Sequence, residues 1–147
     1  MMNNKEVILI TGSVLNSDLQ SVITYEYIKK LFNEHKYEVF SPLETLEFKG
    51  SDQDRYRKAL DVISKSKLMI AEMSNVSTGQ GMEIQYAALL GVPILVIAKK
   101  DSKVSGLVKG CPAVKKIIFY ENIHELKSII PAFVESIQEI GSESRSK

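Results

Sequence analysis

The chain has almost no cysteine, almost no net charge and no long apolar run, and each shortage argues against a class of protein. Its single cysteine, Cys111, cannot form an intrachain disulfide, which favours a reducing, cytoplasmic environment. The net charge is +1, from 19 basic and 18 acidic side chains, so nothing in it supports binding to nucleic acid or to a charged membrane surface. No apolar stretch approaches the roughly 20 residues that span a bilayer, and the polar residues before Val7 do not resemble a signal peptide.

Short apolar runs alternate with segments of helical period along the 147 residues, which are enough for one domain with a hydrophobic core. The expected strands are 7–10, 37–40, 67–72, 93–98 and 116–120. The expected helices are 18–34, 52–66, 80–90 and 122–140, with a helical turn at 104–109. Pro131 is expected to kink or split the last helix, and 43–51 is expected to be a loop. We expect one domain over residues 1–140 and a disordered tail over 141–147.

The alternation of strands and helices predicts an α/β fold, a doubly wound five-stranded parallel sheet in the order 2-1-3-4-5. In this order the first and third strands are neighbours, and the chain reverses direction between them. Ligands bind outside the carboxyl ends of the strands at such a point. The turns that arrive there are 11–13 and 74–81, which are the two turns richest in glycine and serine. We therefore expect both turns to face one cavity.

Residues 74–83, Ser-Asn-Val-Ser-Thr-Gly-Gln-Gly-Met-Glu, lie between an expected strand and an expected helix. Exposed amide groups at a helix N-terminus attract anions, and a carboxylate in the first turn, Glu83, is placed to attack a bound sugar phosphate. The alternative is purely structural. In that case Ser74 and Ser77 only cap and turn the chain, and Glu83 only complements the helix dipole.

Four segments in order along residues 7–120 give the chain a family resemblance. They are Gly12-Ser13, the run Ala-Glu-Met-Ser at 71–74, the pattern Gly79-x-Gly81-x-Glu83, and Ser-Gly-Leu-Val-Lys-Gly at 105–110. With these segments the chain resembles the nucleoside 2-deoxyribosyltransferase superfamily, and within it the 2'-deoxynucleoside 5'-phosphate N-hydrolases. The resemblance implies an enzyme that breaks or exchanges an N-glycosidic bond through a glycosyl-enzyme intermediate, with Glu83 as the nucleophile. No metal or organic cofactor is implied.

The resemblance also implies how a nucleoside 5'-monophosphate is held. The amides of Gly12, Gly79 and Gly81 would line the sugar-phosphate pocket. Ser13, Ser77 and Ser105 would contact the phosphate. Members that transfer nucleosides often carry an aspartate at the position of Ser77, and an aspartate would repel a phosphate to which a serine hydroxyl can donate. Ser105 matches a serine contributed by the neighbouring subunit, which implies a homodimer with shared sites. Taken singly, each serine also fits a turn or cap.

Two positions depart from the family pattern. Ala59 stands where the family has an aspartate that assists proton transfer, and Leu15 stands where the hydrolases have an arginine near the phosphate. Asp54 and Asp61 are out of phase with Ala59 on an expected helix. These departures leave a slow hydrolase, a specialised hydrolase or a non-catalytic nucleotide-binding module on the same fold as possibilities. A nucleoside 2-deoxyribosyltransferase is a further alternative. A phosphoribohydrolase of the lysine-decarboxylase-like type is disfavoured, because its Pro-Gly-Gly-x-Gly-Thr pattern is absent. Neither the base nor the sugar, ribose or deoxyribose, is fixed by these residues.

Overall fold

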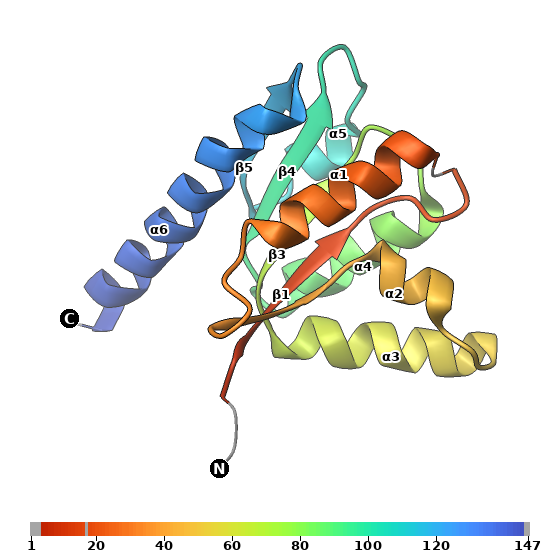
Figure 1. Cartoon of the computed structure of the whole chain (residues 1–147). Helices are drawn as coiled ribbons and strands as arrows, with labels where there is room; N and C mark the ends of the chain where they lie inside the picture. Colours follow the sequence, from red (N-terminus) through yellow and green to blue (C-terminus); the bar gives the residue numbers. More distant parts are fainter. Residues whose placement is uncertain (1–3, 17, 146–147) are drawn as a thin grey trace.

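Five parallel strands form one sheet in the computed structural model, which describes residues 4–16 and 18–145 (Figure 1). The strands are β1 (Glu6–Thr11), β2 (Tyr37–Phe40), β3 (Ser66–Glu72), β4 (Ile94–Lys99) and β5 (Val114–Tyr120). Their order is β2-β1-β3-β4-β5, and every neighbouring pair is parallel. The predicted doubly wound sheet is therefore confirmed.

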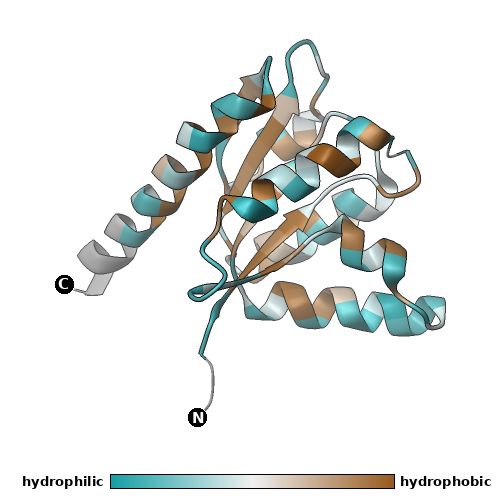
Figure 2. Cartoon of the chain, in the orientation of Figure 1, coloured by the Kyte–Doolittle hydropathy of each residue, from teal (hydrophilic) through white to brown (hydrophobic). Residues whose placement is uncertain are grey.

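Helices cover both faces of this sheet. They are α1 (Leu19–Lys30), α2 (Pro42–Glu47), α3 (Asp52–Lys65), α4 (Thr78–Leu89), α5 (Gly106–Lys109) and α6 (Leu126–Arg145), with a 3-10 turn, η1 (Ile123–Glu125), before α6. One core cluster joins α1 and α6 to the sheet, and a second joins α3, α4 and α5 to the opposite face. Apolar residues are concentrated in the strands between these layers (Figure 2).

The alternation of side chains along each strand decides which residues share a face. In β1, Ile8 and Ile10 belong to the cluster under α1 and α6, whereas Leu9 belongs to the cluster under α3 and α4. Thr11 has the same parity as Leu9 and therefore lies on the side of α3 and α4. In β3, Glu72 has the parity of Ile70 and lies on the side of α1 and α6.

One expectation about the helices was wrong, and one of the two alternatives for the last helix is excluded. Part of the segment expected to be a loop is helix α2, which begins with a capping box in which Ser41 and Glu44 exchange hydrogen bonds, with Pro42 at the first position. Six residues are too few to show a helical period, so only the cap signals this helix in the sequence. Pro131 does not split the last helix, because α6 runs continuously through it.

The predicted boundary between a domain of residues 1–140 and a tail of 141–147 stays a prediction. Helix α6 continues to Arg145, and residues 146–147 lie outside the described part of the chain. Among the described residues, no helix has both the length and the apolar character needed to span a membrane.

The turn after β1 requires glycine, because the ring of Tyr25 packs against Gly12. A Cβ added at Gly12 would lie 2.3 Å from Oη and 2.6 Å from Cε1 of Tyr25. Tyr25 is 2% exposed, and its hydroxyl donates to the carbonyl of Ser13 at 2.9 Å. The ring therefore cannot move aside without losing a buried hydrogen bond.

We predict that Gly12→Ala lowers the free energy of unfolding by about 1–3 kcal/mol, the usual cost of overpacking. The measurement is urea unfolding of the purified variants. Gly79→Ala is the matched control, because a Cβ at Gly79 meets nothing within 4 Å and should leave stability unchanged or slightly raised. Equal stability of Gly12→Ala and the unsubstituted protein would show that the turn tolerates a side chain.

Candidate active site

The loops that follow β1 and β3 meet at the carboxyl edge of the sheet. The side-chain amide of Asn16 donates to the carbonyl of Val76 at 2.7 Å. The side-chain amide of Asn75 donates to Oγ of Ser21, at the start of α1, at 3.2 Å. The loops that follow β1 and β3 are therefore joined by direct contacts, at the point where the strand order reverses. That turns 11–13 and 74–81 face one cavity stays a prediction.

Glu83 lies in the second turn of α4, and its expected place in the first turn was wrong. The helix begins at Thr78 with Ser77 as its N-cap, so the first turn contains no acidic residue. Complementing the helix dipole is therefore not the role of this carboxylate, because that effect is confined to the first turn. Instead Glu83 is partly buried against β1, and Oγ1 of Thr11 donates to its Oε1 at 3.1 Å.

Burial raises the pKa of Glu83 to about 7, and the hydrogen bond from Thr11 opposes this rise. Burial acts on the charged form, which loses contact with water, while the threonine hydroxyl stabilises that form. Near neutral pH the group is thus divided between carboxylate and carboxylic acid. The ionised form is a competent nucleophile, and a pKa shifted in this way is typical of catalytic carboxyl groups.

Gln80 belongs to the site but was not identified from the sequence. Its side chain is 1% exposed, and Nε2 donates to the carbonyl of Thr11 at 3.0 Å and to the carbonyl of Glu72 at 2.8 Å. Its Oε1 is buried without a hydrogen-bond partner among the described residues. In the sequence Gln80 only separates Gly79 from Gly81, and no motif specifies it.

The serines expected to contact phosphate all serve as helix caps or turn residues, which was the alternative interpretation. Oγ of Ser77 accepts from the amide of Gln80 at 3.2 Å and caps α4. Ser13 is 2% exposed, and its Oγ accepts from the amide of Asn16 at 2.9 Å. Ser105 follows β4 and caps α5. The structure therefore places Ser13 and Ser77 on the two joined loops and Ser105 on a separate one.

Both glycines of α4 leave the helix surface open, but the amide of Gly81 is already hydrogen-bonded within the helix. Neither Gly79 nor Gly81 would meet an atom within 4 Å if it carried a Cβ, so the outer surface of this turn is bare backbone. The amide of Gly81 already donates to the carbonyl of Ser77 at 3.2 Å. It is therefore engaged within the helix rather than free for a phosphate.

Glu72 is buried, 6% exposed, at the end of β3 on the opposite face of the sheet from Glu83. Its carboxylate accepts from the amide and the hydroxyl of Ser74, at 2.6 and 2.9 Å, and from the hydroxyl of Tyr120. Oγ of Ser74 in turn accepts from the amide of Lys99 at 2.8 Å. This network fixes the loop after β3, and it does not place Glu72 beside Glu83 as a proton donor.

Neither Asp54 nor Asp61 on α3 replaces the family aspartate. Ala59 is half-buried on α3. Asp61 pairs with Lys65 at 3.0 Å, and Asp54 accepts from the amide of Ser51 at 3.2 Å in a capping box. Both acids are exposed and occupied by local contacts. Among the described residues, no group of three or more His, Cys, Asp or Glu side chains could hold a metal ion.

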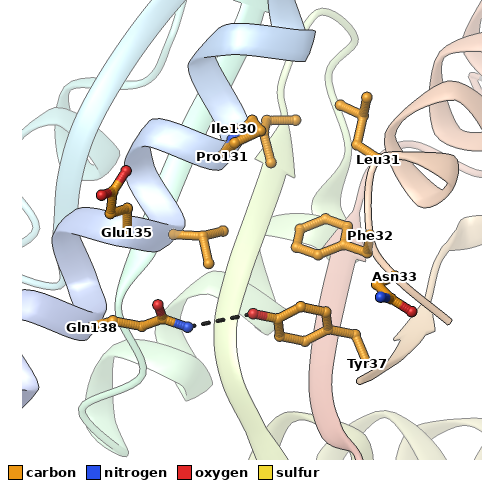
Figure 3. A pocket seen from close by; sticks show the side chains of 9 residues that line it. Leu31, Phe32, Asn33, Tyr37, Ile130, Pro131, Glu135 and Gln138 are labelled. Carbon is orange, nitrogen blue, oxygen red and sulfur yellow. Dashed lines mark hydrogen bonds between the residues drawn. The ribbon is translucent and has the colours of Figure 1, made fainter. Parts of the chain in front are cut away.

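A cavity of about 420 Å³ lies elsewhere, between the end of α1, the start of β2 and α6 (Figure 3). Its walls include Leu31, Phe32, Tyr37 and Pro131, and Gln138 donates to the hydroxyl of Tyr37 across it at 3.4 Å. These segments meet at the amino edge of the sheet, opposite the carboxyl edge where Glu83 lies. The largely apolar walls do not suit a phosphate.

No protein-family model matches the sequence. A Methanosarcina mazei protein provisionally named 2'-deoxynucleoside 5'-phosphate N-hydrolase 1 is 32% identical over 140 residues, covering 90% of this chain and 86% of that protein. A Methanosarcina barkeri protein of the same name is 30% identical over 134 residues, covering 86% and 84%.

Solved structures share the fold. The Clostridium botulinum CMP N-glycosidase BcmB aligns with a TM-score of 0.67 and 19% identity, over 85% of this chain and 98% of that one. The 2-deoxyribosyltransferase of Bacillus psychrosaccharolyticus aligns with a TM-score of 0.64 and 14% identity, over 83% and 90%. The architecture is thus the deoxyribosyltransferase-like α/β fold. Together with the curated relatives, it shows that the chain belongs to the nucleoside 2-deoxyribosyltransferase superfamily, in its 2'-deoxynucleoside 5'-phosphate N-hydrolase family.

We predict that Glu83→Gln stabilises the protein above pH 7 but not near pH 4.5. The pKa of Glu83 is raised from 4.5 to about 7 in the folded state. Between these values the folded protein retains a proton that the unfolded chain releases, so the free energy of unfolding falls as pH rises. Glutamine stays neutral throughout, and its advantage above pH 7 should be about 1–3 kcal/mol.

Urea unfolding at several pH values between 4.5 and 8.5 measures this difference. Glu34→Gln is the matched control, because Glu34 is exposed and should give a difference that does not follow this pH window. A constant difference between Glu83→Gln and the unsubstituted protein would contradict a raised pKa.

Proposed function

We propose that the protein is an N-glycosidase that cleaves the base–sugar bond of a nucleoside 5'-monophosphate through a covalent glycosyl-Glu83 intermediate. The observation that carries the proposal is the Glu83 carboxyl group, partly buried beside the carboxyl ends of β1 and β3, with Oε1 bound by Thr11 and a pKa of about 7. The names of the relatives, N-hydrolase and N-glycosidase, support the same class of reaction.

The reaction has two displacements. In the first, an oxygen of ionised Glu83 attacks the anomeric carbon, the C–N bond breaks, and the base leaves with the electron pair and gains a proton. In the second, water attacks the same carbon, the bond to the Glu83 oxygen breaks, and the water gives up a proton. Both steps pass through an oxocarbenium-like transition state, which the adjacent carboxylate stabilises.

The phosphate would bind where the loops of β1 and β3 meet. Ser13 and Ser77 lie on these loops, and each uses its oxygen to accept a backbone hydrogen bond. Among the described residues neither hydroxyl donates a hydrogen bond, so each hydrogen is available for a phosphate oxygen. The N-terminus of α4, whose outer surface is bare at Gly79, adds a favourable field for an anion.

A second candidate function is nucleotide binding without catalysis. It is favoured by Ala59 in place of the family aspartate and by Leu15, which is 97% exposed, in place of the arginine. These two substitutions remove the family's aspartate for assisting the leaving base and its arginine for the phosphate. A deoxyribosyltransferase, in which an incoming base replaces water in the second step, is the third.

A homodimer with shared sites belongs to the same proposal. Ser105 is the N-cap of the short helix α5, and Leu107 in this helix is 89% exposed. A single exposed leucine is ordinary on a protein surface, so the dimer rests on the resemblance at Ser105. The cytoplasmic location stays a prediction from the single cysteine.

We predict that Glu83→Ala reduces release of free base from nucleoside monophosphates at least about a hundredfold, because covalent capture is lost. The measurement is chromatography of a panel of ribo- and deoxyribonucleoside monophosphates after incubation with pure protein. Glu34→Ala is the control for an exposed glutamate and should keep full activity. Mass spectrometry of acid-quenched protein should find the sugar phosphate on Glu83.

Full activity of Glu83→Ala would remove Glu83 from its role. Binding of a monophosphate by the unsubstituted protein, without base release from any member of the panel, would favour the binding module instead.

We predict that Ser77→Asp weakens monophosphate binding at least about tenfold and leaves binding of the matching nucleoside unchanged. Aspartate caps a helix as well as serine does, so α4 should form normally while a like charge faces the phosphate. Ser77→Asn is the control, because it is a neutral cap and should keep the preference for the monophosphate. Calorimetry measures both ligands. An equal loss for nucleoside and monophosphate would place the phosphate elsewhere.

A further inference from the structure

The first turns of α4 contact the last residue of β1 at two points. Nε2 of Gln80 donates to the carbonyl of Thr11 at 3.0 Å, and Oγ1 of Thr11 donates to Oε1 of Glu83 at 3.1 Å. Gln80 and Glu83 are three residues apart and are therefore neighbours on the helix surface. Two contacts from adjacent helix positions to one strand residue fix both the rotation and the height of α4 against β1.

The Gln80 amide also joins the two strands at the switch point. The pairing of β1 with β3 ends with Thr11 opposite Ala71. One step further, the carbonyl of Glu72 accepts the second hydrogen of the same amide, at 2.8 Å. A single side chain thus ties together the ends of two strands that are far apart in sequence, at the place where Glu83 is held.

Stability alone does not account well for this arrangement. Gln80 is 1% exposed and leaves its Oε1 buried with no partner among the described residues. A buried carbonyl without a hydrogen bond costs free energy, which offsets part of what the two donated bonds contribute. The unpaired Oε1 does not reduce the second effect of the amide, which is to fix the orientation of Thr11.

We propose that Thr11 and Gln80 are positioning residues that hold the Glu83 carboxylate for attack on the sugar. The proposal rests on the proposed role of Glu83 as nucleophile. The hydroxyl of Thr11 binds Oε1 and so leaves Oε2 to form the bond to the anomeric carbon. Gln80 acts through Thr11, because its contacts are with strand carbonyls and not with Glu83 itself.

The same hydroxyl favours the ionised form of Glu83. A donor to the carboxylate stabilises its charged form, so removing the donor should shift ionisation to higher pH. The charged side chains of α3 are exposed, Lys67 of β3 pairs with Glu6, and Tyr86 is the titratable neighbour on α4 itself. Glu72 and, by its parity with Ile97, Lys99 lie on the other face of the sheet. Burial and Thr11 remain as the causes that set the pKa of Glu83.

The test is a carbon-13 NMR titration of the Glu83 carboxyl group in the full-length protein without ligand. Thr11→Val, which keeps the shape of the side chain, should move the titration midpoint up by about one pH unit, a tenfold change in proton affinity. Thr11→Ser should restore it. Gln80→Met should move it in the same direction by less.

The double variant Thr11→Val with Gln80→Met should match Thr11→Val alone, because both changes act through one contact. Thr24→Val is the matched control. Thr24 is 1% exposed and donates to the carbonyl of Gln20 at 2.9 Å in α1, so the variant loses a comparable buried bond on the other face of the sheet. It should leave the Glu83 midpoint in place.

Single-turnover base release at several pH values gives a second readout. In Thr11→Val the ascending limb of the profile should move to higher pH by the same amount, whereas mere loss of stability would lower the rate alike at every pH. An unchanged midpoint in Thr11→Val, or additive shifts in the double variant, would overturn the proposal. Shifted midpoints with no base release by any variant would uphold the positioning contact and overturn the proposed function.

Discussion

The pairing of β1 with β3 is the constraint on which the rest of this structure depends. It joins residues 6–11 to residues 66–72, and it is the place where the direction of winding reverses. Because the strands are parallel, their carboxyl ends lie side by side, and both following loops must leave at the same edge. The residues of the candidate site are positioned from this edge. Thr11 is held by the last residue pair between β1 and β3, Gln80 by the two strand-end carbonyls, and Glu83 by Thr11.

Glu83 shows the tension between stability and chemistry at this edge. A carboxyl group with a pKa raised by burial makes the folded protein less stable at neutral pH than a neutral residue would. In the proposed mechanism the same burial would remove water that competes for the carboxylate and would strengthen its attraction for a positive sugar carbon. Thr11 partly relieves the penalty without restoring solvent. In the proposed mechanism the site would be a compromise, in which a hydroxyl and not a positive charge favours the ionised form of Glu83.

The sequence was sufficient for the sheet, because five apolar runs and their spacing leave few topologies open. It also located the two loops, since glycine and serine mark them. It failed where short-range contacts decide the outcome. The start of α4 at Thr78 depends on the Ser77 cap, and an error of two positions moved Glu83 into the wrong turn. Gln80 could not be recognised at all, because its partners are backbone carbonyls of residues 8 and 69 positions away, and such contacts leave no pattern in side-chain types.

The serines illustrate why a structural role does not count against a binding role. A hydroxyl has two acceptor lone pairs and one hydrogen, so Ser77 can cap α4 through its oxygen and still donate. The cap fixes the rotamer and holds the hydroxyl at the end of the helix where the dipole attracts an anion. For Ser77, then, the geometry that stabilises the helix is also the geometry that would bind a phosphate. For Glu83 the two demands conflict, and that conflict is why a carboxylate there needs a functional explanation while a serine cap does not.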